Sequence, residues 1–599
     1  MSKSWGQRLW ADLVWAITRA HEDFFVKYFR LPFVSLPTGT PAVYTRVRVK
    51  KNVAVPMRDG IKLYANIYKP DADGRFPVIL IRLPYGKDEP YYVMPAYGKY
   101  FARKGYVCVV QDVRGKYASQ GKFEPLINEA ADGYDTLDWI ASQPWCDGNI
   151  GMTGESYYGY TQWAVACLNH PNLKCIVPSE TYADVSGVRH YNNNAFCLQA
   201  MGTWAYAMNA RKWNNPLKLD YWHLPLISMV DNAGVRCDYY KDWIRHPSRD
   251  AYWEPINVCQ KYNQVKIPVY HWGGWYDVYI SSGTINGWRG VKENSDSMEA
   301  RKNQWLLISP TDHEFTPMKT HRIGRIDIGK EAWTYDRLQR FFDYWLKRAD
   351  NGFDRTPRVE IFTIGDNKWR YEDEWPPARV KYTRYYFHSG GGANTLHGDG
   401  LLDREEPGEE PGDEPTDGYV YDPNNPITIS LEMELWSLAQ TLKDRASVER
   451  RADVLVYTTP RLEKDMEITV PINVTLFAAS SARDTDFTVV LVDAFPDGYT
   501  HMIQEGIVRA RYRDSDSEAS LIEPGKIYQY TIDLRATSYV VKGGHHIRVE
   551  ISSSNFNRWD RNPNTGHEFG MDAETIKATQ TIYHDSQHPS RITLPIIPR

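Results

Sequence analysis

Short apolar segments alternate with helical patterns between residues 78 and 348 of the chain. The segments are continuously apolar, which is typical of strands that are buried on both faces of a sheet. Parallel strands need crossover helices between them, and such crossovers place the loops that carry chemistry at the carboxyl ends of the strands. We therefore predict an α/β fold with a parallel sheet covered by helices. The predicted strands are residues 78–83, 106–111, 150–153, 174–178, 267–272 and 305–309, and the predicted helices include 129–143, 157–169 and 335–348.

Two segments depart from this alternation. Residues 183–260 have no strand pattern and are rich in aromatic side chains, so we predict a helical cap inserted between two strands of the sheet. After residue 352, apolar residues recur at every second position, which is typical of an antiparallel sandwich or jelly roll. The predicted parts are an N-terminal helical extension (1–45), the α/β core (46–180 and 261–352), the helical cap (181–260) and the jelly roll (353–599).

The N-terminal extension has apolar residues at roughly helical spacing over residues 4–30. Three roles are open for such a helix: docking on the body of the protein, formation of a homo-oligomer, or contact with a membrane surface. Docking is favoured, because the polar face of the helix is not notably basic. The chain has no apolar stretch of about 18 residues, so no membrane-spanning helix is predicted.

The charge of the chain argues against a nucleic-acid-binding protein, and its cysteine usage argues against a disulfide-bonded one. The formal net charge is −4, and residues 403–417 alone hold eight acidic residues and one arginine, so the rest of the chain is mildly basic. We expect this acidic segment to be an exposed, mobile loop, and we predict no nucleic-acid partner. All seven cysteines lie between residues 108 and 259 without a Cys-x-x-Cys pair, which favours buried thiols in a reducing compartment. Because the N-terminus does not have the pattern of a signal peptide, we expect a cytoplasmic location.

The candidate nucleophile is Ser156. It lies in the sequence Gly-Glu-Ser-Tyr-Tyr-Gly at residues 154–159, between the predicted strand 150–153 and the predicted helix 157–169. A serine on such a strand-to-helix turn exposes its hydroxyl at the edge of the sheet. The helix N-terminus and the backbone N–H of Tyr157 then lie where they can stabilise a developing oxyanion.

The spacing of this motif departs from the common Gly-x-Ser-x-Gly, because the residue two positions after the serine is Tyr158 and the glycine follows one position later. The pattern Gly-x-Ser-Tyr-x-Gly resembles the signature of the family that includes cocaine esterases, X-Pro dipeptidyl-peptidases and α-amino-acid ester hydrolases. The resemblance implies an α/β-hydrolase core with an inserted helical cap and a C-terminal jelly roll of the galactose-binding type. The segments that carry it are 55–60, 82–86, 111–115, 132–135, 143–145, 274–277, 552–556 and 560–566.

A nucleophilic serine needs a general base, and the base needs an orienting carboxylate. In α/β-hydrolases these residues follow in the order Ser, Asp or Glu, His, each on a loop after a strand. Asp277 follows the predicted strand 267–272 and His313 follows 305–309, so order and position select Ser156, Asp277 and His313. The resemblance selects the same three residues. The alternatives are that Asp277 is the N-cap of a helix and that His313 is an ordinary loop histidine.

No His-Gly-Gly-Gly motif is present to form an oxyanion hole. The resemblance implies that the Tyr85 hydroxyl donates one hydrogen bond to the oxyanion and that the backbone N–H of Tyr157 donates the other. A packing role is the alternative for Tyr85. We expect no cofactor and no metal, because the chain has no His-Glu-x-x-His sequence and no paired cysteines.

These features predict a serine carboxylester hydrolase that acts on a small-molecule ester through an acyl-Ser156 intermediate. In the α-amino-acid ester hydrolases of this family, carboxylates two and three positions after the triad aspartate bind the substrate ammonium group. Tyr279 and Ile280 stand at those positions in this chain, so we expect an uncharged, bulky or aromatic acyl group. An X-Pro peptidase or amidase is the first alternative, and a binding protein with an inactive hydrolase core is the second.

Overall fold

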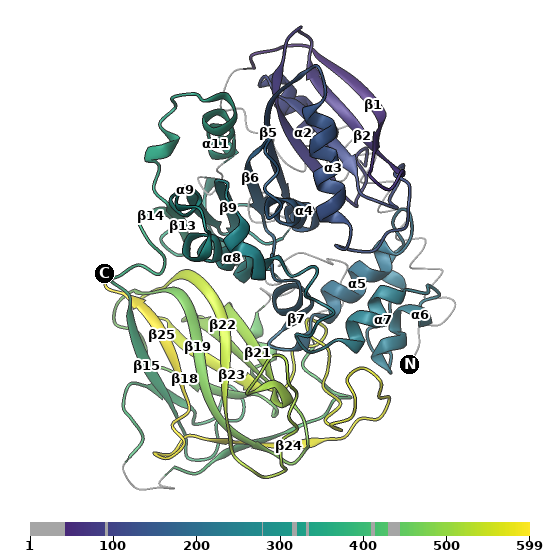
Figure 1. The fold of residues 1–599 in the computed structure, drawn as a ribbon. Helices are drawn as coiled ribbons and strands as arrows, with labels where there is room; N and C mark the ends of the chain where they lie inside the picture. Colours follow the sequence, from purple (N-terminus) through teal and green to yellow (C-terminus); the bar gives the residue numbers. More distant parts are fainter. Residues whose placement is uncertain are drawn as a thin grey trace.

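The structure is a computed structural model that describes residues 42–89, 94–277, 280–313, 320–330, 335–408, 414–428 and 444–599. The chain forms a mixed sheet wrapped by helices and a second body made almost entirely of strands, with a helical segment beside both (Figure 1). Most of the predicted N-terminal extension, residues 1–41, lies outside the described residues. None of the helices in the described ranges has the length and apolar character that crossing a bilayer requires.

The first sheet is built from the following strands: β1 (Val47–Pro56), β2 (Lys62–Pro70), β3 (Phe76–Leu83), β4 (Val107–Asp112), β5 (Cys146–Glu155), β6 (Leu173–Ser179), β9 (Val269–Gly274), β10 (Gln304–Ser309), β13 (Val359–Thr363) and β14 (Lys368–Glu372). Their order is β1-β2-β4-β3-β5-β6-β9-β10-β13-β14. Neighbouring strands from β4 to β13 are parallel, whereas β1, β2 and β14 form antiparallel pairs at the two edges. All six predicted strands are present, and they form the parallel centre of the sheet.

The last two strands of this sheet correct the expectation for the residues after 352. β13 and β14 lie within the residues predicted to form the jelly roll, but β13 pairs with β10 and β14 pairs with β13. All five residues of β13 are buried, as expected for a strand inside a covered parallel sheet. A short strand has the same local sequence pattern in either sheet, so the pattern did not reveal which sheet it joins.

Two groups of helices pack against the first sheet. One group contains α3 (Glu129–Ala141), α4 (Ser156–Ala166) and α8 (Ser281–Asn294), and the other contains α2 (Met94–Arg103) and α11 (Tyr335–Lys347). In the first group, Trp163 of α4 lies against Gly287 of α8. If residue 287 had a Cβ, that atom would be only 3.0 Å from the Trp163 indole. In the second group, the rings of Phe101 and Phe342 pack edge to face with their centroids 6.1 Å apart. The predicted sheet with helical cover is therefore confirmed.

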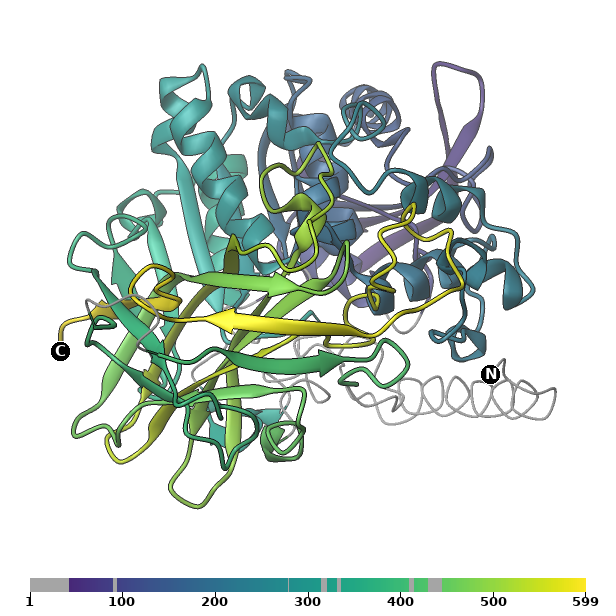
Figure 2. The same cartoon turned by 90° about the horizontal axis from the view of Figure 1, so that it is seen from below.

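The segment predicted as a cap is mainly helical. It contains α5 (Leu198–Met208), α6 (Met229–Asn232), α7 (Asp238–Arg245) and a small hairpin of β7 (Tyr191–Asn192) and β8 (Ala195–Phe196). The segment contacts both bodies: Trp204 Nε1 donates a hydrogen bond to the Tyr85 hydroxyl at 3.1 Å, and the backbone N–H of Phe196 donates to Asp560 Oδ1 at 2.9 Å. Figure 2 shows a loop of the second body, in yellow, alongside these helices.

The second body contains the following strands: β15 (Lys381–His388), β16 (Leu401–Asp403), β17 (Asp417–Tyr421), β18 (Leu455–Thr458), β19 (Met466–Ser480), β20 (Asp486–Ala494), β21 (Thr500–Arg509), β22 (Tyr528–Val541), β23 (His546–Ser552), β24 (Ala578–Tyr583) and β25 (Arg591–Ile597). Their order is β17-β24-β19-β25-β15-β16-β18-β23-β20-β21, and β22 pairs with β19. All pairs except β16 with β18 are antiparallel. The prediction of a separate C-terminal body of strands is confirmed.

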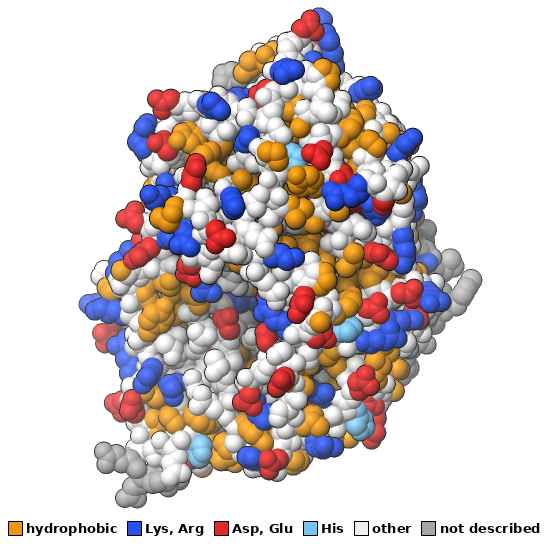
Figure 3. Space-filling model, in the orientation of Figure 1, with side chains coloured by type: hydrophobic (Ala, Val, Ile, Leu, Met, Phe, Trp, Pro, Cys, Tyr) orange, Lys and Arg blue, Asp and Glu red, His pale blue; other side chains and the backbone are white. Residues whose placement is uncertain are grey.

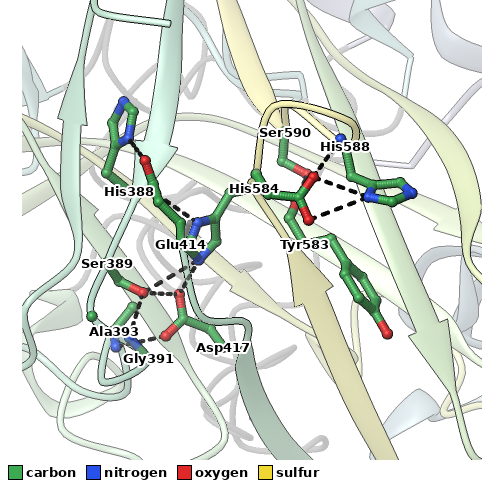
Figure 4. A network of polar contacts seen from close by, with 12 residues as sticks. His388, Ser389, Gly391, Ala393, Glu414, Asp417, Tyr583, His584, His588 and Ser590 are labelled. Carbon is green, nitrogen blue, oxygen red and sulfur yellow. Dashed lines mark hydrogen bonds and ion pairs between the residues drawn. The ribbon is translucent and has the colours of Figure 1, made fainter. Parts of the chain in front are cut away.

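The acidic segment 403–417 is anchored where the structure describes it. Glu414 is shared by two imidazoles, because His388 Nδ1 lies 2.6 Å from one carboxylate oxygen and His584 Nδ1 lies 2.9 Å from the other (Figure 4). Asp417 is fully buried and accepts a hydrogen bond from Ser389 Oγ at 2.7 Å. These two carboxylates raise the pKa of His584 against the opposing effect of burial. The expectation of an exposed, mobile loop was therefore wrong for this end of the segment, because ionic hydrogen bonds hold it against the sheet.

Candidate active site

Ser156 lies at the sharp turn where β5 ends and α4 begins. Its φ of 55° is in the left-handed region, a strained conformation that non-glycine residues adopt at nucleophile turns. The spacing of the motif has a steric explanation. A Cβ at Gly154 would overlap the ring of Tyr158, and a Cβ at Gly159 would lie 2.5 Å from the Thr181 side chain. Tyr158 fits two positions after the serine because its ring lies over Gly154.

The backbone of Ser156 is tied to the residues that follow β6. The Ser156 N–H donates a hydrogen bond to the Glu180 carbonyl at 2.9 Å. Thr181 Oγ1 donates to the Ser156 carbonyl at 2.6 Å. These two bonds fix the turn against the neighbouring strand, so the direction of the serine side chain is set by the sheet itself.

The structure brings Asp277 and His313 together. The two residues follow β9 and β10, which are adjacent parallel strands, and His313 Nδ1 lies 2.8 Å from Asp277 Oδ2. The Asp277 side chain is 0% exposed and that of His313 is 18% exposed. The N-cap of α8 is Ile280, and it makes no side-chain capping bond, so the Asp277 carboxylate is directed to the imidazole instead of to the helix. β5, β6, β9 and β10 are consecutive in the sheet, which places all three candidate residues at one edge.

The turn before Asp277 is braced by the second body of the protein. Gln504 of β21 donates from Nε2 to the Trp275 carbonyl at 3.1 Å, and His501 Nε2 lies 3.1 Å from the Tyr276 hydroxyl. Burial lowers the pKa of His501 to about 3, so its imidazole is neutral at physiological pH. The second body therefore helps to position Asp277, and the sequence did not reveal this role.

Tyr85 lies on the loop after β3, with only 5% of its surface exposed. Its hydroxyl accepts a hydrogen bond from Trp204 Nε1 at 3.1 Å. Burial raises the pKa of this phenol, and the hydrogen bond from Trp204 offsets part of the effect. The hydroxyl therefore stays protonated at neutral pH, and it can donate a hydrogen bond to an oxyanion at the serine.

The loop that carries Tyr85 is held by a buried ion pair. Lys87 Nζ lies 2.7 Å from Asp112 Oδ2, and the Lys87 backbone N–H donates to Asp112 Oδ1 at the same distance. Asp112 ends β4, the strand next to β3 in the sheet. Two bonds to one carboxylate fix the loop more firmly than a single exposed pair does.

Tyr157 is the second residue of α4, and N–H groups in the first turn of a helix have no partner within the helix. Its side chain points away from the serine: the phenol is fully buried, donates to Glu129 Oε1 at 2.8 Å and accepts from the Leu126 N–H at 2.9 Å. The Tyr157 side chain is therefore bound elsewhere, and the predicted role in the oxyanion hole concerns its backbone N–H alone.

One cluster in the described residues has the side-chain arrangement that a metal ion needs: His567, Asp572 and Glu574. His567 Nδ1 lies 2.7 Å from Asp572 Oδ2, and the Glu574 N–H donates to Asp572 Oδ1 at 2.9 Å. Both oxygens of the central carboxylate are thus already bound within the loop. We assign no metal to this exposed cluster.

Two residues near the site, Trp204 and Glu180, belong to none of the motifs singled out in the sequence. Trp204 comes from α5, far along the chain, and its indole N–H reaches the Tyr85 hydroxyl. Glu180 is a buried acid immediately after β6, and its carbonyl binds the Ser156 N–H. The position of Glu180 at the carboxyl end of a central strand was the available signal, since that edge of a parallel sheet collects functional side chains.

Two family models match the chain. Residues 59–314 match the X-Pro dipeptidyl-peptidase (S15 family) model, and residues 351–593 match the model of the X-Pro dipeptidyl-peptidase C-terminal non-catalytic domain. Cocaine esterase from Rhodococcus sp. (strain MB1 Bresler) is 36% identical over 590 residues, which cover 92% of this chain and 99% of the relative.

Solved structures agree with this assignment. An α-amino acid ester hydrolase has a TM-score of 0.80 and 26% identity, covering 94% of this chain and 100% of its own. An aminopeptidase from a marine sediment archaeon, Thaumarchaeota archaeon, has the same TM-score and identity and covers 94% of this chain and 99% of its own. The chain belongs to the family of serine hydrolases that contains cocaine esterase and the X-Pro dipeptidyl-peptidases.

Proposed function

We propose that this protein hydrolyses small-molecule carboxylic esters with an uncharged, bulky or aromatic acyl group through an acyl-Ser156 intermediate. Serine ester hydrolysis as the class of reaction follows from the family. The observation that carries the assignment to these residues is the 2.8 Å contact between His313 Nδ1 and Asp277 Oδ2, at the sheet edge where Ser156 lies.

Each residue has a defined role in this proposal. Ser156 Oγ attacks the ester carbonyl carbon while His313 accepts the serine proton, and His313 then returns that proton to the leaving alcohol. Water attacks the acyl-enzyme in the second half of the reaction with the same base. Asp277 holds the imidazole in the tautomer with its proton on Nδ1. Tyr85 and the Tyr157 N–H stabilise the tetrahedral oxyanion.

Aromatic side chains around the nucleophile support the proposed acyl group. The Tyr85 ring stacks on Trp213 with centroids 5.7 Å apart, and it packs edge to face on Tyr158 at 6.1 Å. Trp204 binds the Tyr85 hydroxyl. The names of two relatives, cocaine esterase and α-amino acid ester hydrolase, refer to esters, whereas the archaeal relative is named an aminopeptidase. A peptidase or amidase is therefore the second candidate.

A direct comparison of leaving groups tests this choice. We expect p-nitrophenyl benzoate and p-nitrophenyl butyrate to be turned over faster per active site than alanyl-proline p-nitroanilide. The ester bond is easier to cleave, and we have assigned no carboxylate to bind the free amino group of a peptide. Absorbance of the released nitrophenol or nitroaniline measures both rates, with active sites counted by a fluorophosphonate probe. Faster turnover of the anilide would reverse the assignment in favour of the peptidase.

Replacing Tyr85 with phenylalanine tests the proposed oxyanion donor. We expect kcat for p-nitrophenyl butyrate to fall roughly 100-fold to 1000-fold with little change in KM, because the bond to the oxyanion strengthens only in the transition state. Tyr160→Phe is the matched control: it also loses a buried hydroxyl, one that donates to the Ile256 carbonyl at 2.9 Å. If Tyr85→Phe keeps the kcat of the control, Tyr85 is a packing residue.

We propose a cytoplasmic location for the protein. All seven cysteines are free thiols, and burial raises the pKa of Cys197 to about 12, so this thiol is uncharged. Buried thiols without disulfides support a cytoplasmic location. Figure 3 shows side chains of both charge signs interspersed over the visible face, in keeping with an uncharged small-molecule substrate. A homo-oligomer formed through the N-terminal helix stays a prediction, because residues 1–41 lie outside the described residues.

A further inference from the structure

Glu180 is a buried acid at the centre of the candidate active site. It follows β6, which lies between the strand that carries Ser156 and the strand that leads to Asp277. The residue is 0% exposed, and its φ of 38° is in the left-handed region. A buried carboxyl in a strained conformation is unfavourable unless the surrounding structure holds it there, so its contacts indicate what it does.

The contacts of Glu180 reach all three loops of the candidate triad. Its carbonyl accepts from the Ser156 N–H at 2.9 Å, and its Oε1 accepts from Thr311 Oγ1 at 2.9 Å, two residues before His313. A Cβ at Gly274 would lie 2.8 Å from Glu180 Oε1, so the carboxyl also fills the space beside the turn that leads to Asp277. Glu180 is therefore packed between the three loops.

The remaining oxygens of Glu180 and Asp277 determine the charge of this pair. Glu180 Oε2 and Asp277 Oδ1 are both buried, and no donor in the described part of the chain reaches either atom. The Asp277 carboxylate lies close enough to Glu180 to act on it electrostatically. If both groups were ionised, both oxygens would be buried acceptors without a donor, whereas a proton on one carboxyl group lets it donate to the other and satisfies both atoms.

Of the two groups, Glu180 is the one placed to carry this proton. Asp277 Oδ2 faces His313 Nδ1 at 2.8 Å, and the acid of a Ser-His-Asp triad accepts from that N–H with a carboxylate oxygen. Burial, and next the charge of Asp277, raise the pKa of Glu180 well above its usual range. The charge of Glu155 raises this pKa further. Thr311 donates to Oε1 and opposes the effect in part.

We propose that Glu180 is a positioning residue: as a neutral carboxylic acid it donates a hydrogen bond from Oε2 to Asp277 Oδ1 and so holds the Asp277 carboxylate toward His313. The inference rests on the proposed roles of Asp277 and His313. Without this donor, Asp277 Oδ1 is a buried charged acceptor with no partner, and the carboxylate is free to turn away from the imidazole.

Two substitutions separate positioning from packing. Glu180→Gln keeps the size of the side chain, donates an N–H to Asp277 and accepts from Thr311, so we expect its kcat for p-nitrophenyl butyrate at pH 7 to lie within about threefold of wild type. Glu180→Met keeps the length but has no donor, and we expect kcat to fall about 10-fold to 100-fold with KM almost unchanged. Equal losses in both variants would overturn the proposal.

The pH dependence gives a second, independent measurement. In wild type, ionisation of Glu180 at alkaline pH places a second negative charge beside Asp277, so we expect an alkaline fall in kcat that is absent from Glu180→Gln. The same alkaline fall in both proteins would contradict the proposal.

Thermal stability tests the proton without using activity. The pKa of Glu180 is higher in the folded state than in the unfolded chain, so between these two values unfolding releases a proton and wild-type stability falls as pH rises. We expect the Tm of Glu180→Gln minus that of wild type to increase from about pH 5 to about pH 9. A constant difference would show that Glu180 is ionised in the fold, and the proposal would fail.

These measurements also distinguish the inference from the proposed function. Wild-type ester turnover and its dependence on Ser156 test the function alone. If turnover is absent, the proposed function fails, and the Tm series still decides whether Glu180 is protonated. If turnover is present and Glu180→Gln behaves like Glu180→Met, only the role of Glu180 is wrong.

Discussion

Replacing Ser156 with alanine is expected to lower kcat for p-nitrophenyl butyrate about a million-fold, close to the rate that binding and oxyanion stabilisation give without a nucleophile. The fold should persist, because alanine at φ 55° is no more strained than the serine that it replaces. Hydrolysis with active-site-counted enzyme measures the loss, and a fluorophosphonate probe should label wild type but not the variant. Circular dichroism and Tm check that the variant is folded.

Ser389 provides the matched control for this experiment. Its Oγ lies 3.3 Å from His584 Nε2, and His584 Nδ1 lies 2.9 Å from Glu414, so the three residues resemble a second Ser-His-acid arrangement. Ser389 nevertheless donates its proton to Asp417 at 2.7 Å, and His584 is held between two carboxylates. We expect Ser389→Ala to keep wild-type activity. Retained activity in Ser156→Ala would contradict the proposed function. If Ser389→Ala lost activity and Ser156→Ala did not, the nucleophile would be Ser389 in the second body.

The centre of the fold could be predicted because each of its strands must be apolar on both faces. Residues 150–153 and 305–309 are recognisable for that reason, and both belong to parallel strands in the structure. The order Ser, Asp, His on successive strand ends then selected His313 and Asp277, which lie 2.8 Å apart. Local pattern and chain order are enough here because a parallel sheet converts order along the chain into position along one edge.

Contacts between distant parts of the chain could not be predicted in this way. Gln504 supports the turn before Asp277, and Trp204 binds the Tyr85 hydroxyl. In each case more than a hundred residues separate the two partners along the chain. No local pattern records such a pairing. Glu180 was missed for a different reason: an acid after a strand ordinarily indicates an exposed loop, and only the burial of this residue in the fold gives it a role.

Asp277→Asn is expected to lower kcat about ten-thousand-fold while the fold and KM change little. The amide is the same size as the carboxylate, so the packing at this fully buried position is kept. The chemistry differs, because an amide has one acceptor and one donor where the carboxylate has two acceptors. A protonated Glu180 donates to the amide oxygen, and the amide NH₂ group then faces His313 Nδ1. The imidazole is forced to carry its proton on Nε2, where it cannot accept the proton of Ser156.

Asp312→Asn is the control for this substitution, because Asp312 is buried and lies next to His313 in the chain. A carboxylate adjacent in sequence is badly placed to orient the ring of its neighbour, so we expect a loss at least two orders of magnitude smaller than that of Asp277→Asn. The pH profile of the residual activity adds a further test. If Asp277 acts through the tautomer of His313, the residual rate of Asp277→Asn should rise with pH as hydroxide replaces the missing base. Equal losses in the two variants would assign the orienting carboxylate to Asp312 and leave Asp277 with a structural role.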